Sequence, residues 1–119
     1  MSRVMLALKS VLARQDRVSL LVFDEVDSGV GGTTARAVGR KLGQIGRARQ
    51  VLCVTHLPQV ACFSADHFEV SKSVSGGRTV ARVERLDGDG RVESLARMLG
   101  GRKVTEAGLR HARELMESP

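Results

Sequence analysis

The segment LLVFDEVDSGVGG, residues 20–32, most strongly limits the folds open to this chain. Its four consecutive apolar residues, Leu20 to Phe23, predict a strand that is buried on both faces, as in a parallel sheet. Val51 to Val54 repeat the pattern, and the residues between the two runs have the length and spacing of a helix. Strand, helix and strand in that order predict a right-handed βαβ unit with parallel strands, and therefore an α/β fold.

The helix between these strands is expected to follow the glycines, with Thr33 as its N-terminal cap. Its apolar positions recur at helical spacing and should face the sheet. These positions are Val38, Leu42 and Ile45. The cationic positions that should face outward are Arg36, Arg40 and Arg47.

Apolar spacing and turn residues predict the remaining elements. A first helix is expected over Ser2 to Arg14, and a hairpin should pair His67–Val74 with Thr79–Leu86 across Ser75 to Gly77. Asp87 to Gly90, DGDG, is typical of a turn. Two closing helices are expected at Val92–Leu99 and Thr105–Met116, separated by two glycines. The chain shows no repeat and no domain linker.

Polar residues follow both predicted strands. Asp24 and Glu25 end the first strand, and Thr55 and His56 follow the second. A βαβ unit brings the carboxyl ends of its parallel strands to one edge, where ligands bind in open α/β sheets. Adjacent carboxylates there suit phosphate chemistry, since Asp24 can bind Mg²⁺ while Glu25 positions an attacking water. The alternative is a loop whose acids only face solvent.

The chain carries a net charge of +6, which favours contact with polyanions but also suits a basic protein with solvated faces. Residues 33–50 contain five cations and no acid, so Arg36, Arg40 and Lys41 are candidate contacts for a phosphate backbone. Cys53 and Cys62 form no CxxC pair, which predicts reduced core cysteines rather than zinc or disulfide chemistry. No apolar run reaches the ~18 residues of a membrane span, and we expect a cytoplasmic protein without a membrane partner.

The ordered motifs resemble a known family. LLVFDE resembles the Walker B strand of ATP-binding-cassette (ABC) ATPases, VDSGVGG their D-loop, and VLCVTH the strand that leads to their switch histidine. The sequel VTHLPQVACFSADHFEV is similar to the RecN family of bacterial DNA-repair proteins, relatives of the structural-maintenance-of-chromosomes (SMC) ATPases. SRVMLALKSVLA and LARMLGGRKVTEAGLRHARELM also resemble that family. The resemblance therefore covers essentially the whole chain.

The resemblance implies roles for individual residues. Asp24 would help to bind Mg²⁺, Glu25 would be the catalytic carboxylate, and His56 would contact the γ-phosphate of ATP. The D-loop residues would lie at the interface between two heads. Those residues are Asp27, Ser28 and Gly29. His67 and His111 match no motif and are expected to be structural.

One family motif is missing from these 119 residues: the GxxxxGK[ST] phosphate loop, Walker A. Residues 1–119 are therefore expected to form a single partial domain, the C-terminal lobe of an ABC-type (P-loop NTPase) head, with Met1 marking a cut. Such a lobe would be inactive alone and would need an N-terminal lobe to bind ATP. The resemblance further implies a head–head homodimer that engages double-stranded DNA on the bacterial nucleoid during double-strand-break repair and recombination.

Two other functions remain open. The chain could be a nonenzymatic basic α/β module that binds DNA or a partner and uses DEVD, residues 24–27, as an interface loop. Alternatively, DEVD could be the acidic metal cluster of a nuclease with a topoisomerase–primase fold. That fold needs another acid at an earlier strand end, and the sequence before Asp16 contains none.

Overall fold

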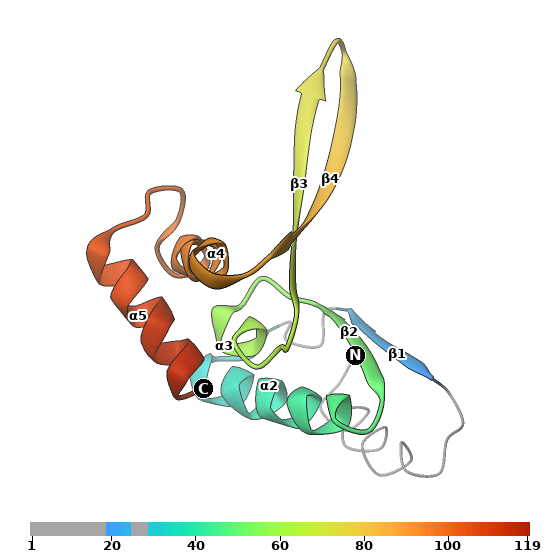
Figure 1. Ribbon diagram of the computed structural model, residues 1–119, viewed down its shortest axis with the longest axis vertical. Coiled ribbons are helices and arrows are strands. Elements are labelled where there is room, and N and C mark those ends of the chain that lie inside the picture. The colour runs from blue at the N-terminus through green and yellow to red at the C-terminus, as the bar shows by residue number, and fades with distance from the viewer. Residues whose placement is uncertain (1–18, 25–28) are drawn as a thin grey trace.

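The computed structural model describes residues 19–24 and 29–119, and the expected helix over Ser2 to Arg14 lies outside these ranges. The described residues form a mixed α/β structure in which a long hairpin projects from a body of strands and helices (Figure 1). In chain order the elements are β1 (Leu20–Asp24), α2 (Gly32–Gly46), β2 (Gln50–Val54), α3 (Pro58–Ala61), β3 (His67–Ser75), β4 (Arg78–Leu86), α4 (Gly88–Gly100) and α5 (Glu106–Glu117).

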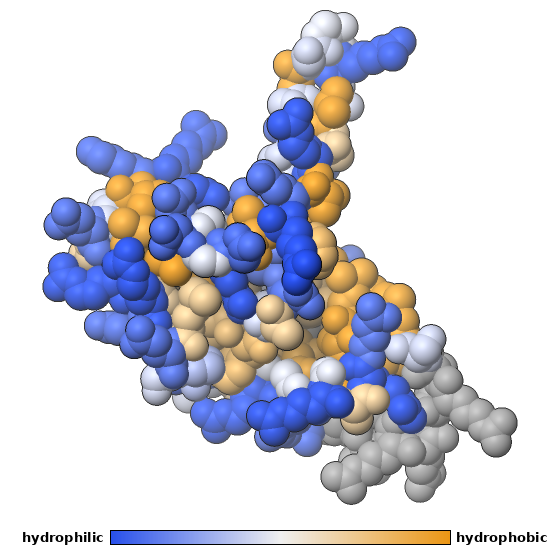
Figure 2. All heavy atoms as spheres, in the orientation of Figure 1, coloured by the Kyte–Doolittle hydropathy of each residue, from blue (hydrophilic) through white to orange (hydrophobic). Residues whose placement is uncertain are grey.

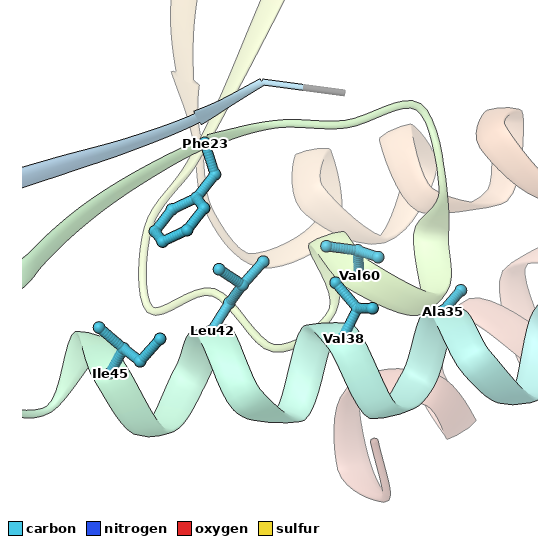
Figure 3. Packing of buried hydrophobic residues seen from close by; sticks show 6 residues of the cluster. All are labelled: Phe23, Ala35, Val38, Leu42, Ile45 and Val60. Atoms are coloured by element: carbon cyan, nitrogen blue, oxygen red, sulfur yellow. The ribbon is translucent and has the colours of Figure 1, made fainter. Parts of the chain in front are cut away.

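Strands β1 and β2 pair in parallel, in a register that runs from Leu20 opposite Gln50 to Asp24 opposite Val54. Helix α2 connects them and packs its apolar stripe against one face, so the expected βαβ unit is confirmed. The ring of Phe23 points from β1 toward α2 and is completely buried (Figure 3). The buried side chains of this core are Phe23, Ala35, Val38, Leu42, Ile45 and Val60.

The expectation that both strands are buried on both faces is wrong for the described part of the chain. Val22, Leu52 and Val54 are 51%, 49% and 55% exposed, because α2 covers only the face that carries Phe23. β1 and β2 form a two-stranded sheet in the described residues. The sheet therefore presents an apolar face to solvent. Figure 2 shows apolar residues gathered on the surface of the body near β1 and β2.

The cap predicted for α2 is also wrong. The helix begins at Gly32, and Gly31 is its N-cap with extended backbone and no side-chain hydrogen bond. The carbonyl oxygen of Gly31 accepts a bond of 2.8 Å from the amide of Ala35, so Thr33 already lies inside the first turn of the helix. The expected orientations are confirmed. Val38, Leu42 and Ile45 are buried, whereas Arg36, Arg40 and Arg47 are exposed.

The expected hairpin is confirmed. β3 and β4 pair along their whole length, from His67 opposite Leu86 to Ser75 opposite Arg78. Gly76 and Gly77 form the turn with φ angles of 57° and 75°, a left-handed conformation that glycine adopts without steric cost. Both strands are largely exposed, and apolar residues lie along the projecting ribbon in Figure 2.

Helices α4 and α5 pack on each other and form a second core. Its buried residues are Cys62, Val92, Leu95, Ala96, Ala112 and Leu115. DGDG is not a free turn as expected: Asp87 is the N-cap of α4, and Gly88 to Gly90 form its first residues. Thr105 caps α5 rather than joining it, since its Oγ1 accepts a 3.0 Å bond from the amide of Gly108.

Polar contacts join the base of the hairpin to α4. Oε1 of Glu69 accepts bonds of 3.0 Å from Oγ of Ser94 and 2.9 Å from Nη2 of Arg97. The bond from Arg97 is the main reason that the pKa of Glu69 lies below its ordinary value. Arg85 of β4 forms an ion pair of 2.6 Å with Asp66. The hairpin is therefore anchored at its base, while its outer part contacts little else.

Candidate active site

The candidate site lies where the two parallel strands end. Asp24 is the last residue of β1 and pairs in register with Val54, the last residue of β2. Thr55 and His56 follow Val54 directly, so the carboxylate and the imidazole lie at the same edge of the sheet, as the sequence predicts. Both Asp24 and His56 are exposed.

A short turn after β2 holds the loop that carries His56. The amide of Leu57 donates a 3.0 Å hydrogen bond to Oγ1 of Thr55, a turn in which the hydroxyl replaces a backbone carbonyl. The carbonyl of Leu57 then accepts bonds of 3.1 Å from the amides of Val60 and Ala61 in α3. Because the chain is fixed on both sides of His56, its imidazole is presented to solvent from a constrained backbone.

The glycine-rich loop before α2 leaves space around its backbone. Gly29 has a φ of 72°, which favours glycine. A Cβ built on Gly29, Gly31 or Gly32 would meet no atom within 4 Å, so packing in the described structure does not require glycine at these positions. That open backbone is accessible to a ligand or to another chain.

Glu25, Asp27 and Ser28 lie outside the described residues. No group of three or more potential metal ligands is found among the residues that the structure describes. The carboxylate of Asp24 is exposed and has the oxygen chemistry that Mg²⁺ prefers, so it fits one position of such a site.

The three candidate DNA contacts are exposed on α2. Arg36, Arg40 and Lys41 all lie on this helix, but Arg36 and Arg40 share a groove with His111 of α5, whereas Lys41 does not line it. Sequence reasoning missed His111, because the residue lies 71 positions beyond Arg40 and follows no motif. Only the packing of α5 beside α2 reveals the association.

Both cysteines of the sequence lie among the described residues. Cys53 and Cys62 are not joined by a disulfide, and burial raises the pKa of the Cys62 thiol. None of the described helices is long and apolar enough to cross a membrane.

No protein-family model matches the chain, but curated proteins do. It is 44% identical over 117 residues to the DNA repair protein RecN of Bacillus subtilis, 50% over 116 residues to that of Deinococcus radiodurans, and 47% over 118 residues to that of Streptomyces coelicolor. These alignments cover 98–99% of the chain but 20–21% of each relative. The chain thus spans about a fifth of the length of its relatives, and the resemblance to RecN expected from the motif order is confirmed.

A solved structure supports the fold. A structure from work titled "Structural biochemistry of ATP-driven dimerization and DNA stimulated activation of SMC ATPases" matches with a TM-score of 0.62 at 14% identity. The match covers 83% of this chain and 59% of the other. At this identity the likeness establishes the fold alone. The expected fold class, an α/β lobe of the kind found in these ATPases, is therefore confirmed.

Proposed function

We propose that this RecN-like chain is the C-terminal half of the ATP-hydrolysing head of a bacterial DNA double-strand-break repair protein. The observation that carries the proposal is the shared sheet edge, at which Asp24 and the loop of His56 follow paired parallel strands. The 44–50% identity to RecN proteins and the SMC-like fold support the same assignment. Residues 1–119 then form one partial domain that acts in the bacterial cytoplasm.

In the complete head, bound Mg²⁺ would offset negative charge on the phosphates of ATP. Asp24 would hold the ion directly or through water, and Glu25 would orient and deprotonate the attacking water. His56 would donate an N–H toward the γ-phosphate and stabilise charge that develops in transfer. The fixed turn at Thr55 supports this role, because a catalytic donor is most effective when its position is set beforehand.

The other lobe of the head would supply what this chain lacks. The sequence contains no phosphate loop, so an N-terminal lobe must hold the phosphates. The exposed apolar face of β1 and β2 supports a docked lobe, because Val22, Leu52 and Val54 would lose contact with water there. Asp27, Ser28 and Gly29 would lie in the interface of a head–head homodimer.

The test is Mg²⁺-dependent ATP turnover by the complete RecN-like protein that contains this chain. We expect Glu25→Gln to lower kcat by about 10²- to 10⁴-fold, because general-base catalysis contributes that much. Glu117→Gln makes the same chemical change at an exposed position at the end of α5 and should leave turnover unchanged. Undiminished turnover in the Glu25 variant, or turnover by the 119-residue chain alone, would contradict the proposal.

The second candidate is a nonenzymatic basic module that binds DNA or a partner. The observation that favours it is the exposed cationic surface of α2, where Arg36, Arg40 and Lys41 have no acidic neighbour in residues 33–50. Binding of duplex DNA by the complete protein, together with the absence of ATP turnover, would favour this candidate over the ATPase.

A further inference from the structure

A groove of about 590 Å³ lies between α2 and α5, with Gln59 of α3 also in its lining. Figure 1 shows the C-terminal end of α5 next to the start of α2, with α3 nearby. The side chains that matter for its chemistry are Thr33, Arg36, Arg40, Gln59, His111 and Leu115. These residues come from three helices, so only the folded chain forms the groove.

The side chains that line the groove are suited to bind an anion. Arg36 and Arg40 supply two guanidinium groups, and His111, Thr33 and Gln59 add further hydrogen-bond donors. None of the lining residues is acidic, and the sequence contains no Asp or Glu between Asp27 and Asp66. A planar guanidinium group can donate two parallel N–H bonds to two oxygens of one phosphate.

Of the two arginines, Arg36 also has a hydrogen-bond partner within the chain. Nη2 of Arg36 donates a 3.0 Å hydrogen bond to the carbonyl oxygen of Ser118, which holds the end of α5 near α2. That carbonyl is neutral, so the charge of Arg36 is not compensated. Among the ion pairs of the described residues, none involves Arg36, Arg40 or His111. The positive potential of the groove is therefore available to a ligand.

The cations of α2 extend beyond the groove along one side of the helix. Arg36, Arg40 and Arg47 are spaced i, i+4 and i+11, which places them within about 40° of one another at 100° per residue. They span about 16 Å along the helix axis, a length over which one strand of B-DNA carries about five phosphates. Lys41 is turned about 100° from Arg40. A line of cations suits a polyanion better than a single small anion.

We propose that this groove binds a backbone phosphate of double-stranded DNA, with Arg40 and His111 on one phosphate and Arg47 following the same strand. The inference rests on the proposed DNA-repair function but is independent of the ATP site. Its contacts are to phosphate, so it positions the duplex without reading its sequence.

The test measures binding of a fluorescent duplex to the complete protein as salt concentration is raised. The slope of log Kobs against log[salt] reports phosphate contacts, at roughly 0.9 per contact. Arg40→Gln combined with His111→Gln should make the slope shallower by about one. Lys103→Gln removes one charge from the exposed segment between α4 and α5, outside the groove, and should leave the slope unchanged. The double variant leaves the Arg36–Ser118 contact in place, and thermal unfolding checks that α5 remains packed.

Each result decides the proposal. An unchanged slope in the double variant, or an equal loss in Lys103→Gln, would overturn the groove as a specific contact. Displacement of the duplex by inorganic phosphate beyond its effect on ionic strength would assign the groove to a free anion and also overturn the DNA assignment. DNA-free ATP turnover, measured on the same preparations, should not change in the double variant. Failure of the Glu25→Gln test would remove the ATPase proposal without altering the salt slopes.

Discussion

Replacement of Gly39 by alanine should force α2 and α3 apart. Gly39 is buried, and a Cβ at this position would lie 2.6 Å from Cδ2 of Phe63 and 2.9 Å from the carbonyl oxygen of Gln59. The phenyl ring can turn aside, but the carbonyl belongs to the backbone of α3 and moves only with that helix. Glycine is therefore required here by the close approach of two helices.

Gly43 provides a matched control one turn later on the same helix. Its Cβ would lie 3.7 Å from the carbonyl oxygen of Phe63 and 3.8 Å from the Cβ of Phe63, which is ordinary contact. Alanine at either position gains up to about 1 kcal/mol of helix propensity. Overpacking costs about 1–3 kcal/mol and applies only at Gly39. The two variants should thus differ by about 1–3 kcal/mol, roughly 5- to 150-fold in a local opening equilibrium.

Amide hydrogen exchange followed by mass spectrometry on the complete protein resolves this difference, because it reports opening segment by segment. Gly39→Ala should accelerate exchange in peptides from α2 and α3, whereas Gly43→Ala should leave exchange equal or slower. Equal protection in both variants would refute the argument that close contact between α2 and α3 explains the glycine at position 39.

Two further predictions follow from the hairpin anchor and the exposed sheet. Because Arg97 holds the pKa of Glu69 below 4.5, the stabilisation by this carboxylate is complete above pH 4.5 and is lost as the pH falls through the lower folded-state pKa. In urea titrations, the unfolding midpoint of Glu69→Gln should therefore fall less steeply at acidic pH than that of the unchanged protein. The same acid dependence in both proteins would exclude this anchor as the cause of that dependence. The isolated 119-residue chain should self-associate in light scattering through its exposed apolar strands; a monodisperse monomer with protected amides would count against that view.

Local patterns in the sequence predicted most of the helices and strands, because the formation of these elements depends mainly on residues that are close in the sequence. The spacing of Val38, Leu42 and Ile45 determines which side of α2 is buried, and two glycines set the hairpin turn. The predicted cap was wrong because two nearby residues can each begin the same helix. Gly31 and Thr33 can both begin α2, and the backbone selects Gly31, whose carbonyl already accepts from Ala35.

Burial of the strands was predicted less well for a different reason. The apolar run of β1 reflects the surroundings that the strand needs, whereas the described residues cover only the Phe23 side. The Val22 side of the sheet needs a covering element that the described residues do not contain. A pattern of hydrophobicity can therefore describe an environment that the described part of the chain does not complete.

The candidate site was predicted in part. The sequence predicts that Asp24 and His56 lie at one edge of the sheet, because parallel strands align their carboxyl ends. The groove could not be found in this way, because Arg40 and His111 come together only through the placement of α5. Long-range packing between helices leaves no short motif in a sequence.

The projecting hairpin also bears on how the chain avoids aggregation while it folds. Its two strands are joined by a two-residue turn, whereas β1 must find a partner 30 positions away, so the hairpin can close within microseconds and precede the parallel pair. In register, Lys72 stands opposite Ala81 on the face that carries Val70 and Val83, and Arg85 stands opposite Phe68 at its base. Charges set within an apolar ribbon discourage other strands from adding to it. The runs Leu20–Phe23 and Val51–Val54 contain no charge, and Asp24 and Arg49 lie only at their edges, so a nascent chain is more vulnerable to misassembly at the strands that lead to the candidate active site.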